Sequence, residues 1–263
     1  MNIGLIIIGD EILSGKRQDK HLPKLIELLA ARGMSLSWAR FVGDDRARIT
    51  AELRHALSSG DLVFSCGGIG ATPDDHTRQC AAAASGLELA LHPQARDLIL
   101  ERMRDVAAEQ GQPYEPDRAD NVHRLNMGVF PAGATLIPNP YNKIAGFSLG
   151  PVHFVPGFPV MAWPMMAWVL DQLYPHLHRS ERGPERSVIV FGAIEASLTP
   201  LMEEIEARFL AVRVFSLPSV DHAEWGRHIE LGVKGEGDVL GAFAALRQGL
   251  QQFGAKLGPE VVR

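Results

Sequence analysis

The stretch DLVFSCGGIGATPDDHTRQC, which runs from Asp61 to Cys80, limits the possible fold of this chain more than any other. Residues 62–66 are mostly apolar and have the length of a buried strand. Glycine residues then break the apolar run, and a helix is expected to begin near His76. A strand, a glycine turn and a helix in this order are typical of a parallel sheet, which binds ligands at the carboxyl ends of its strands.

The glycine turn and the acidic pair after it have the chemistry of a phosphate and metal site. Glycine lets backbone N–H groups approach a ligand, and a helix N-terminus favours negative charge. Asp74 and Asp75 offer the oxygen ligands that hard divalent cations take. Either Asp alone could instead cap the helix. A cap does not need the three glycines Gly67, Gly68 and Gly70, so the whole cluster favours a ligand site.

A second candidate site follows the first apolar run, residues 2–9, in the loop GDEILSGKRQDKH. Gly9, Gly15 and Lys16 resemble a Walker loop, but five residues separate the glycines instead of four. Arg17 also stands where a Ser or Thr should hold magnesium. The Walker interpretation therefore fails, but a charged loop directly after a buried strand remains a candidate site.

Hydrophobic periodicity predicts an alternation of helices and strands along the rest of the chain. Asp44 and Asp45 precede one of these helices, and an Asp in that place is a good N-cap. The predicted elements are helices at 22–29, 49–57, 95–106, 160–173, 198–209 and 239–250, and strands at 35–42, 144–149, 152–155, 187–191, 212–217 and 228–233. Residues 111–126 are expected to be irregular, residues 130–140 are expected to be a turn-rich connection, and residues 178–185 are expected to be a linker.

Composition excludes several classes of protein. The chain has 263 residues, 46% of them hydrophobic and 22% charged, which predicts one large or two modest packed domains. A net charge of −5 without a long basic run argues against a nucleic-acid partner. The two cysteines are too few for a disulfide framework, and no stretch is long enough to span a membrane. The N-terminus lacks the basic segment of a signal peptide, so we expect a cytoplasmic protein.

Two further features of the sequence have both a structural and a functional interpretation. Arg118, His123 and Arg124 could reach a ligand phosphate, although such residues more often form a solvated face. The helix at 160–173 is apolar nearly all round, which is typical of core or of a subunit interface. Together with the small C-terminal unit, it predicts a homo-oligomer, most simply a two-fold dimer.

Five segments resemble a known family: GDEILSG, VGDD, GGIGATPDDHT, NPYNKIAGF and VPGFP. In order and spacing they are similar to the molybdopterin-binding, MoaB/MogA-like domain, in the subtype that begins CinA proteins. The resemblance covers about residues 1–175. It implies an α/β, three-layer domain with a mostly parallel sheet over 1–177. Residues 186–254 resemble the small α+β, KH-type second domain of CinA proteins, and the amidase domain that ends many of them is expected to be absent.

The resemblance also implies functional residues. The catalytic acidic positions of the family fall on Asp75 and Asp44, and a divalent metal (Mg, Mn or Co) is expected at Asp75 and Asp74. Ligand or phosphate contacts are expected at Gly9, Glu11, Ser14, Gly15, Gly67, Gly68, Gly70, Thr72, Asn139 and Lys143. The family binds molybdopterin or its adenylylated form, and CinA-type members are associated with metal-dependent hydrolysis of ADP-ribose-like pyrophosphates.

The chain departs from the family at three places. Asn142-Lys143 stands where Gly-Thr is usual, Ala71 replaces a proline, and residues 160–162 lack a glutamate expected after the PGFP turn. The leading hypothesis from the resemblance is a metal-dependent pyrophosphatase. Because of these departures, the alternative is a non-catalytic molybdopterin-binding protein linked to molybdenum cofactor biosynthesis. An NAD-binding interpretation of Gly68 and Gly70 fails, because Pro73 occupies the position of the third glycine.

Overall fold

The computed structural model describes residues 1–179 and 184–262. The chain forms two compact units, Met1–His178 and Arg179–Arg263. Part of the predicted linker, residues 180–183, lies outside the described residues. Within the described residues, no helix combines the length and the apolar character needed to cross a membrane.

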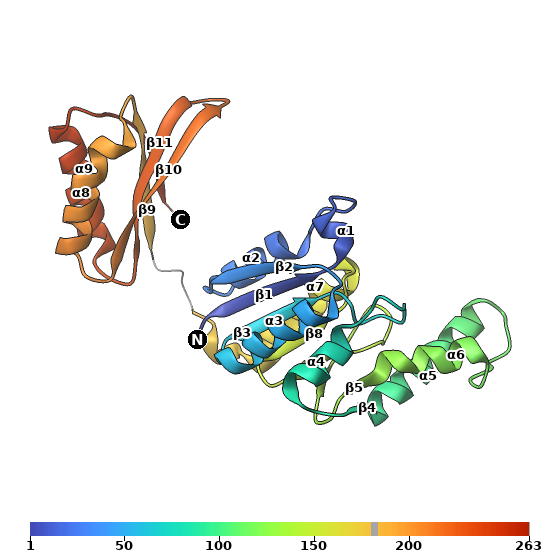
Figure 1. Ribbon diagram of the computed structural model, residues 1–263. Helices are drawn as coiled ribbons and strands as arrows, with labels where there is room; N and C mark the ends of the chain where they lie inside the picture. Colours follow the sequence, from blue (N-terminus) through green and yellow to red (C-terminus); the bar gives the residue numbers. More distant parts are fainter. Residues whose placement is uncertain (180–183, 263) are drawn as a thin grey trace. The chain divides into compact units, whose positions relative to one another are not determined.

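Unit 1 is built on a six-stranded sheet with the strand order β2-β1-β3-β8-β7-β6 (Figure 1). The first four of these strands are parallel to one another, whereas β7 is antiparallel to both β8 and β6. The strands are β1 (Ile3–Ile8), β2 (Trp38–Val42), β3 (Leu62–Cys66), β6 (Thr135–Ile137), β7 (Gly146–Leu149) and β8 (Val152–Val155). The predicted mostly parallel sheet is confirmed.

Helices cover both faces of this sheet, which gives the three predicted layers (Figure 1). The helices are α1 (Asp10–Leu13), α2 (His21–Ala30), α3 (Arg46–Ser59), α4 (Thr77–Ser85) and α7 (Pro159–Leu173). Helices α2 and α7 pack with one face of β1 and β3, and α3 and α4 pack with the other. All residues of β1 and β3 are buried, because a sheet covered on both sides favours continuous apolar strands.

The remainder of unit 1 lies beside α4 and contains elements that the sequence did not reveal (Figure 1). Two short strands, β4 (Leu89–Leu91) and β5 (Val129–Pro131), pair next to the predicted helix α5 (Pro93–Glu109). The prediction that 111–126 is irregular is wrong in part, because α6 (Ala119–Arg124) and a 3-10 turn, η1 (Leu125–Gly128), form there. A second 3-10 turn, η2 (Pro175–Leu177), follows α7.

Unit 2 is a four-stranded antiparallel sheet with the order β10-β11-β9-β12 and two helices packed on one face. Its elements are β9 (Glu185–Phe191), α8 (Glu195–Arg208), β10 (Val212–His222), β11 (Gly226–Gly235), α9 (Val239–Gln252) and β12 (Lys256–Val262). The prediction stopped at α9 and missed β12, which pairs with β9 and completes the sheet. The predicted α+β class of this unit is confirmed.

Candidate functional site

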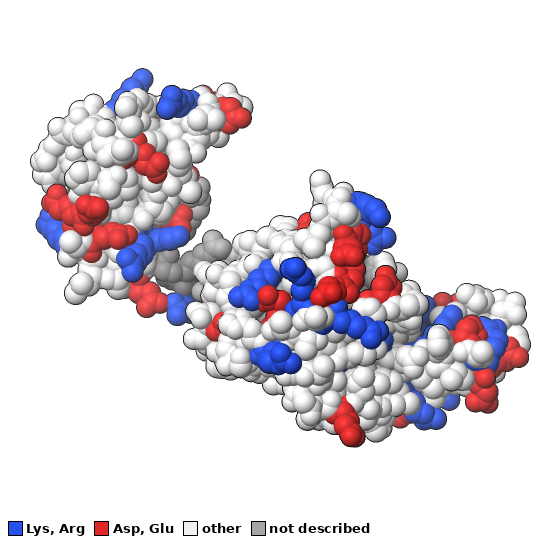
Figure 2. Space-filling view, in the orientation of Figure 1, with Lys and Arg blue, Asp and Glu red and all other residues white. Residues whose placement is uncertain are grey.

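The candidate site is a cavity of about 700 Å³ at the carboxyl ends of β1, β3 and β8. Three loops meet there: residues 9–17 after β1, residues 67–76 after β3 and residues 156–158 after β8. Acidic side chains gather at the α1 end of the sheet, and basic side chains lie beside them (Figure 2). Four carboxylates line the cavity, namely Glu11, Asp44, Asp74 and Asp75. Such a concentration of negative charge suits a cation or a cation–phosphate complex.

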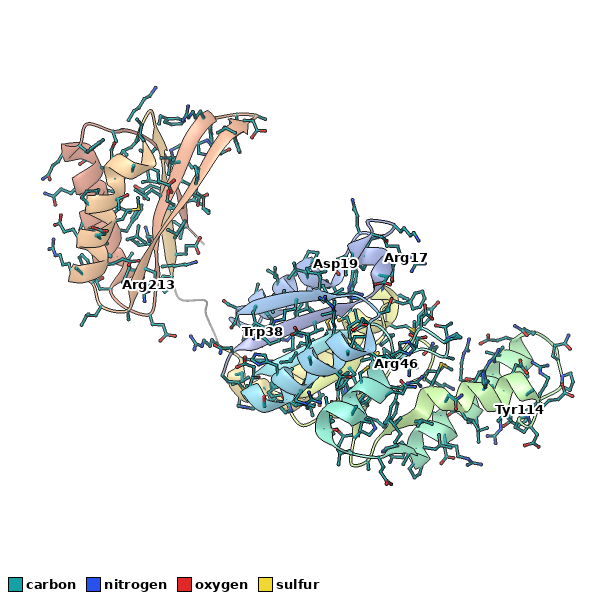
Figure 3. All side chains as sticks on the ribbon, in the orientation of Figure 1. Arg17, Asp19, Trp38, Arg46, Tyr114 and Arg213 are labelled. Atoms are coloured by element: carbon teal, nitrogen blue, oxygen red, sulfur yellow. The ribbon has the colours of Figure 1, made fainter. Side chains whose placement is uncertain are left out.

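Two cations, Lys16 and Arg17, also line the cavity. Both come from the loop that resembled a Walker motif, and Figure 3 shows Arg17 next to α1. Within the described residues, neither side chain forms an ion pair with a carboxylate. They are therefore available to an anionic ligand. The loop lacks the spacing of a Walker motif, but it brings positive charge to the cavity.

The glycine turn after β3 is packed too closely for side chains. Gly67 and Gly68 have φ values of 104° and 68°, in the region that favours glycine. A Cβ on Gly67 would lie 2.3 Å from the carbonyl oxygen of Ile8, and one on Gly68 would lie 2.2 Å from Thr77 Oγ1. The Thr77 hydroxyl donates to the carbonyl of Gly67 at 3.0 Å. Packing within the protein therefore requires glycine at both positions, whether or not a ligand is bound.

Some backbone N–H groups of this glycine turn are available to bind phosphate, and others are not. The N–H of Gly67 donates to the Val155 carbonyl at 3.0 Å within the sheet, so this group is not available to a ligand oxygen. In the described part of the chain, the N–H groups of Gly68, Ile69 and Gly70 have no acceptor. All three residues line the cavity, so these groups can donate to ligand oxygens.

Asp75 closes the acidic turn instead of capping α4. Its Oδ2 accepts a hydrogen bond from the N–H of Thr72 at 2.9 Å and another from the Thr72 hydroxyl. The residue before α4 is His76, and no side chain caps this helix. Because Oδ2 alone is engaged among the described residues, Oδ1 is left for a ligand. The pKa of Asp74 is held below its usual value. The causes are a hydrogen bond from the Thr72 side chain, a hydrogen bond from its own backbone N–H and the charge of His76.

Asp44 and Asp10 tie the first two loops together. The N–H of Asp10 donates to Asp44 Oδ2 at 2.9 Å, and the N–H of Asp44 donates to Asp10 Oδ1 at 3.1 Å. Asp45, not Asp44, caps α3 by accepting from the N–H of Arg48 at 2.8 Å. Partial burial raises the pKa of Asp44, and the neighbouring carboxylates of Asp10, Glu11 and Asp74 raise it further. Asp44 is therefore free of a capping role and faces the cavity.

Arg78 is a buried cation whose role could not be recognised from the sequence alone. Its side chain is 4% exposed, and its guanidinium donates to the carbonyl of Gly70 at 2.6 Å and to the carbonyl of Asn126. Desolvation lowers its pKa, and Asp75 opposes that shift. Arg78 thereby joins the acidic loop to η1, whose Met127 lines the cavity. The sequence does contain one indication of this role, because Arg78 is a charged residue within a helix of small residues, TRQCAAAAS.

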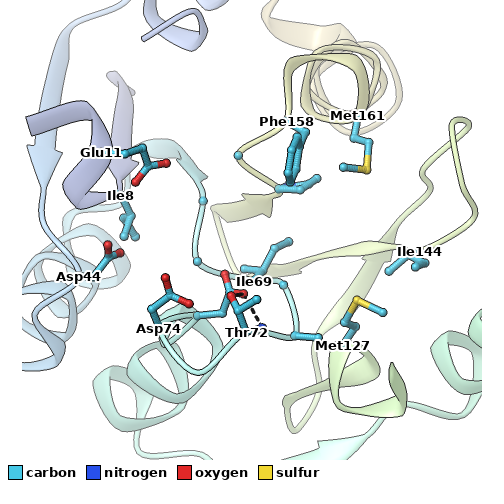
Figure 4. Close-up of a pocket in the computed structure, with 18 of the residues that line it drawn as sticks. Ile8, Glu11, Asp44, Ile69, Thr72, Asp74, Met127, Ile144, Phe158 and Met161 are labelled. Carbon is cyan, nitrogen blue, oxygen red and sulfur yellow. Dashed lines mark hydrogen bonds between the residues drawn. The ribbon is translucent and has the colours of Figure 1, made fainter. Parts of the chain in front are cut away.

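The other wall of the cavity is apolar (Figure 4). Met127, Ile144, Phe158 and Met161 lie across from Glu11, Asp44 and Asp74 in this view, with Ile69 between the two groups. Flat rings and thioether groups pack well against a heterocycle. The cavity therefore combines an anionic end with an apolar wall, which suits a ligand that joins phosphate to a planar ring.

Asn139 shapes this apolar wall through bonds within its own loop. It is 5% exposed, its Nδ2 donates to Asn142 Oδ1 and to the Ile144 carbonyl, and its Oδ1 accepts from the Tyr141 N–H. These bonds have lengths between 2.8 and 3.0 Å. The amide of Asn139 is therefore used to hold the loop and is not directed at a ligand by these contacts.

The cavity brings together ten of the site residues expected from the sequence: Gly9, Glu11, Asp44, Gly67, Gly68, Gly70, Thr72, Asp74, Asp75 and Asn139. Ser14 lines a shallower hollow next to the cavity, and Gly15 lies outside it. Lys143 is also outside, because its Nζ contacts Glu101 at 2.7 Å and Asp105 at 2.6 Å on α5. Arg118, His123 and Arg124 do not line the cavity either.

The carboxylates fit a divalent cation that shares its shell with water and phosphate. In the described residues, no group of three or more His, Cys, Asp or Glu side chains is placed to hold one metal ion. A closed protein cage is therefore not formed. Mg²⁺ is usually bound by one or two carboxylates together with waters and substrate phosphates. Asp75 Oδ1 and the exposed Asp74 match that requirement.

Comparisons with known proteins give matches over unit 1 and beyond it. The family model described as "probable molybdopterin binding domain" matches residues 4–177. A CinA-like protein of Syntrophotalea carbinolica is 29% identical over 80% of this chain and 51% of its own length. A CinA-like protein of Geobacter metallireducens is 31% identical over 78% of this chain and 49% of its own length. The chain thus spans about half the length of these curated relatives.

One solved structure supports the fold directly. The crystal structure of CinA from Thermoplasma acidophilum, described as a protein of unknown function, is 26% identical to the matched part of this chain. The match covers 66% of this chain and 99% of that one, with a TM-score of 0.54. The shared region has the size of unit 1 and not of the whole chain.

Proposed function

Because this chain belongs to the family of probable molybdopterin-binding domains, we propose that its cavity binds a nucleotide or pterin phosphoanhydride and hydrolyses it with a divalent metal. ADP-ribose-like pyrophosphates are the proposed substrate class. The observation that carries this proposal is the position of Asp75. Thr72 fixes one oxygen of this carboxylate beside the glycine turn, and the apolar wall lies across the same cavity.

Each part of the site has a role in the proposed reaction. When bound, a divalent cation would supply positive charge to the phosphates and lower the pKa of a bound water. Asp75 Oδ1 and Asp74 would hold that cation, and the N–H groups of residues 68–70 would donate to phosphate oxygens. Asp44, whose pKa is raised, suits the task of accepting a proton from the attacking water. Arg78 would keep the loop in place.

The test is product analysis with purified protein. ADP-ribose, FAD and ATP are incubated separately with Mg²⁺, Mn²⁺ or Co²⁺, and AMP is quantified by chromatography. The proposal expects AMP from at least one substrate, and from ADP-ribose it expects ribose 5-phosphate in equal amount. Removal of the metal with EDTA should stop the release. Absence of AMP with every substrate and every metal would refute the hydrolase proposal.

A second candidate function is non-catalytic binding of molybdopterin, linked to molybdenum cofactor biosynthesis. Met161 favours it, because this residue lines the cavity where the related sequences are expected to carry a glutamate. A thioether cannot bind a hard cation or transfer a proton as a carboxylate does. Co-purified ligand, identified by mass spectrometry, distinguishes the candidates: a pterin without AMP release supports this second function.

Two proposals concern unit 2 and assembly. We propose that unit 2 is a KH-type module and that the protein is a homodimer. Five apolar residues of α7 are buried in unit 1, and Met161, Trp163 and Trp168 pack partly buried against the same core. Helix α7 therefore gives the dimer less support than its sequence suggested. Exposed apolar side chains of unit 2 give more, since Leu210, Leu217 and Val220 are 84%, 54% and 74% exposed. Light scattering at micromolar concentration tests the dimer, and a monomer would refute it.

A further inference from the structure

A second cavity, of about 420 Å³, adjoins the candidate site. We call it the side cavity; it is lined by Glu11, Ile12, Arg17, Gln18, Asp19, Lys20, His21, Gly157, Phe158 and Pro159. Four of these residues, Glu11, Arg17, Gly157 and Phe158, also line the 700 Å³ cavity. The two cavities therefore adjoin along these four residues. Pockets for small ligands have volumes of roughly 300–1,000 Å³.

His21 is a buried polar residue with one nitrogen unused. It is 5% exposed and begins α2, and its Nε2 lies 3.0 Å from the carbonyl oxygen of Gly157. Since a carbonyl only accepts, Nε2 is the nitrogen that carries the proton. Burial lowers the pKa of His21, which favours the neutral ring. Its Nδ1 is then an acceptor, and it has no hydrogen-bond partner among the described residues.

An unpaired buried acceptor costs free energy, and a ligand hydroxyl is the group that would satisfy it. Asp19, which also lines the side cavity, accepts two backbone hydrogen bonds. Its Oδ1 accepts from the N–H of His21, and its Oδ2 accepts from the N–H of Leu22, each at 2.9 Å. These bonds hold the start of α2 and engage each carboxylate oxygen once. His21, which lines the side cavity, thus keeps a neutral acceptor that has no donor among the described residues.

Positive charge stands at the junction of the two cavities. Arg17 lines both, Lys20 lines the side cavity, and neither forms an ion pair within the described part of the chain. Figure 3 shows Arg17 and Asp19 in the loop that follows α1. A guanidinium binds a phosphate through two parallel hydrogen bonds. Arg17 is therefore suited to bind a phosphate group located where the two cavities adjoin.

We propose that the side cavity binds the polyol-phosphate end of a two-ended diphosphate, with Arg17 on its phosphate and His21 Nδ1 accepting from a sugar hydroxyl. This inference rests on the proposed function, because it assigns the second half of the same substrate class. The planar ring of the ligand would lie against the apolar wall, and the bridge between the phosphates would lie near the four carboxylates.

The test measures binding and does not depend on turnover. The probes are AMP, which has one end, and the α,β-methylene analogue of ADP-ribose, which has two ends and cannot be cleaved at the bridge. Dissociation constants are measured by calorimetry with Mg²⁺ for the wild type, His21→Gln and Arg17→Gln. Glutamine can keep the hydrogen bond to Gly157 while it removes Nδ1. Arg54→Gln, on the exposed side of α3, is the control for lost charge.

The proposal predicts a pattern across ligands. The analogue should bind His21→Gln about fivefold more weakly and Arg17→Gln about tenfold more weakly than the wild type. AMP should bind His21→Gln within twofold of the wild type, and Arg54→Gln should change neither constant. Equal affinities of the analogue for the wild type, His21→Gln and Arg17→Gln would overturn the proposal, and so would failure of the wild type to bind the analogue.

The outcomes separate this inference from the proposed function. If the predicted pattern is found and no diphosphate is hydrolysed, the side cavity stands and the hydrolase proposal fails. If ADP-ribose is hydrolysed and both variants bind the analogue as the wild type does, the hydrolase proposal stands and the side cavity fails. Thermal unfolding of His21→Gln is measured as well, so that a loss of fold is not read as a loss of binding.

Discussion

Substitution of Asp75 by Asn separates the structural role of this residue from its proposed chemical role. In the wild type, Oδ2 accepts two hydrogen bonds from Thr72, and Oδ1 is left for a metal. Asn keeps one carbonyl oxygen, which can accept the same two bonds, but it loses the negative charge. The substitution therefore removes metal binding and retains the turn.

The expected magnitudes follow from these contacts. Hydrogen bonds to a charged acceptor contribute about 1.5–3 kcal/mol and neutral ones about 0.5–1.5 kcal/mol, so two weakened bonds cost about 2 kcal/mol. For a domain of this size that corresponds to a fall in melting temperature of roughly 4–8 °C. Turnover should fall far more, by a factor of about 10² or more, because a cation that stabilises transition-state charge contributes several kcal/mol.

The assay compares Asp75→Asn with Asp45→Asn. Asp45 caps α3, and Asn is an equally good N-cap, so this control changes the same atoms near the site without an expected effect. AMP release is measured with ADP-ribose and Mn²⁺, and Mn²⁺ affinity is measured by calorimetry. Hydrolysis and Mn²⁺ affinity equal to the wild type in Asp75→Asn would refute the reasoning. An equal loss in Asp45→Asn would show a general effect of charge.

Three further substitutions test other parts of the structure. Arg78→Met should lower stability by about 2–4 kcal/mol, because it removes the charged donor of two part-buried hydrogen bonds to backbone carbonyls, and denaturant unfolding measures this. Gly68→Ala should cost more than Gly15→Ala in the same assay: both have positive φ, but a Cβ meets Thr77 at the first and nothing within 4 Å at the second. Equal costs would contradict the packing argument. Burial lowers the pKa of His153 to about 4, against about 6.5 in an unfolded chain. The unfolded state therefore binds a proton first as pH falls, and stability should decrease by about 2 kcal/mol between pH 7 and pH 5. His153→Gln should remove this component, and an unchanged pH dependence in that variant would contradict it.

The sequence predicted unit 1 well where a strand is buried on both faces. Residues 62–66 were predicted and found as β3, because an unbroken apolar run has one explanation in a parallel sheet. Short or exposed strands could not be predicted in this way. Strand β4 is three residues long and exposed, and β12 is an edge strand of mixed polarity. Their pairing with β5 and β9 depends on tertiary contacts that no local pattern encodes.

Site residues were predictable where a charged residue directly follows a parallel strand. They were less predictable where a side chain forms contacts outside the cavity. Asp44 and Asp75 reach the cavity because both follow parallel strands whose carboxyl ends meet. Lys143 looked like a phosphate contact, but two carboxylates on α5 attract it away from the cavity. The apolar wall was missed, since Met127 and Phe158 come from segments that meet only in the folded chain.

The most direct test of the central claim is a crystal structure of the protein with Mn²⁺ and the α,β-methylene analogue of ADP-ribose, with the metal located by anomalous scattering. The account predicts a manganese ion within about 2.0–2.3 Å of Asp75 Oδ1, shared with phosphate oxygens. It also predicts the adenine against Phe158 and Met161. A metal bound away from Asp75 and Asp74, or an analogue bound outside both cavities, would contradict it.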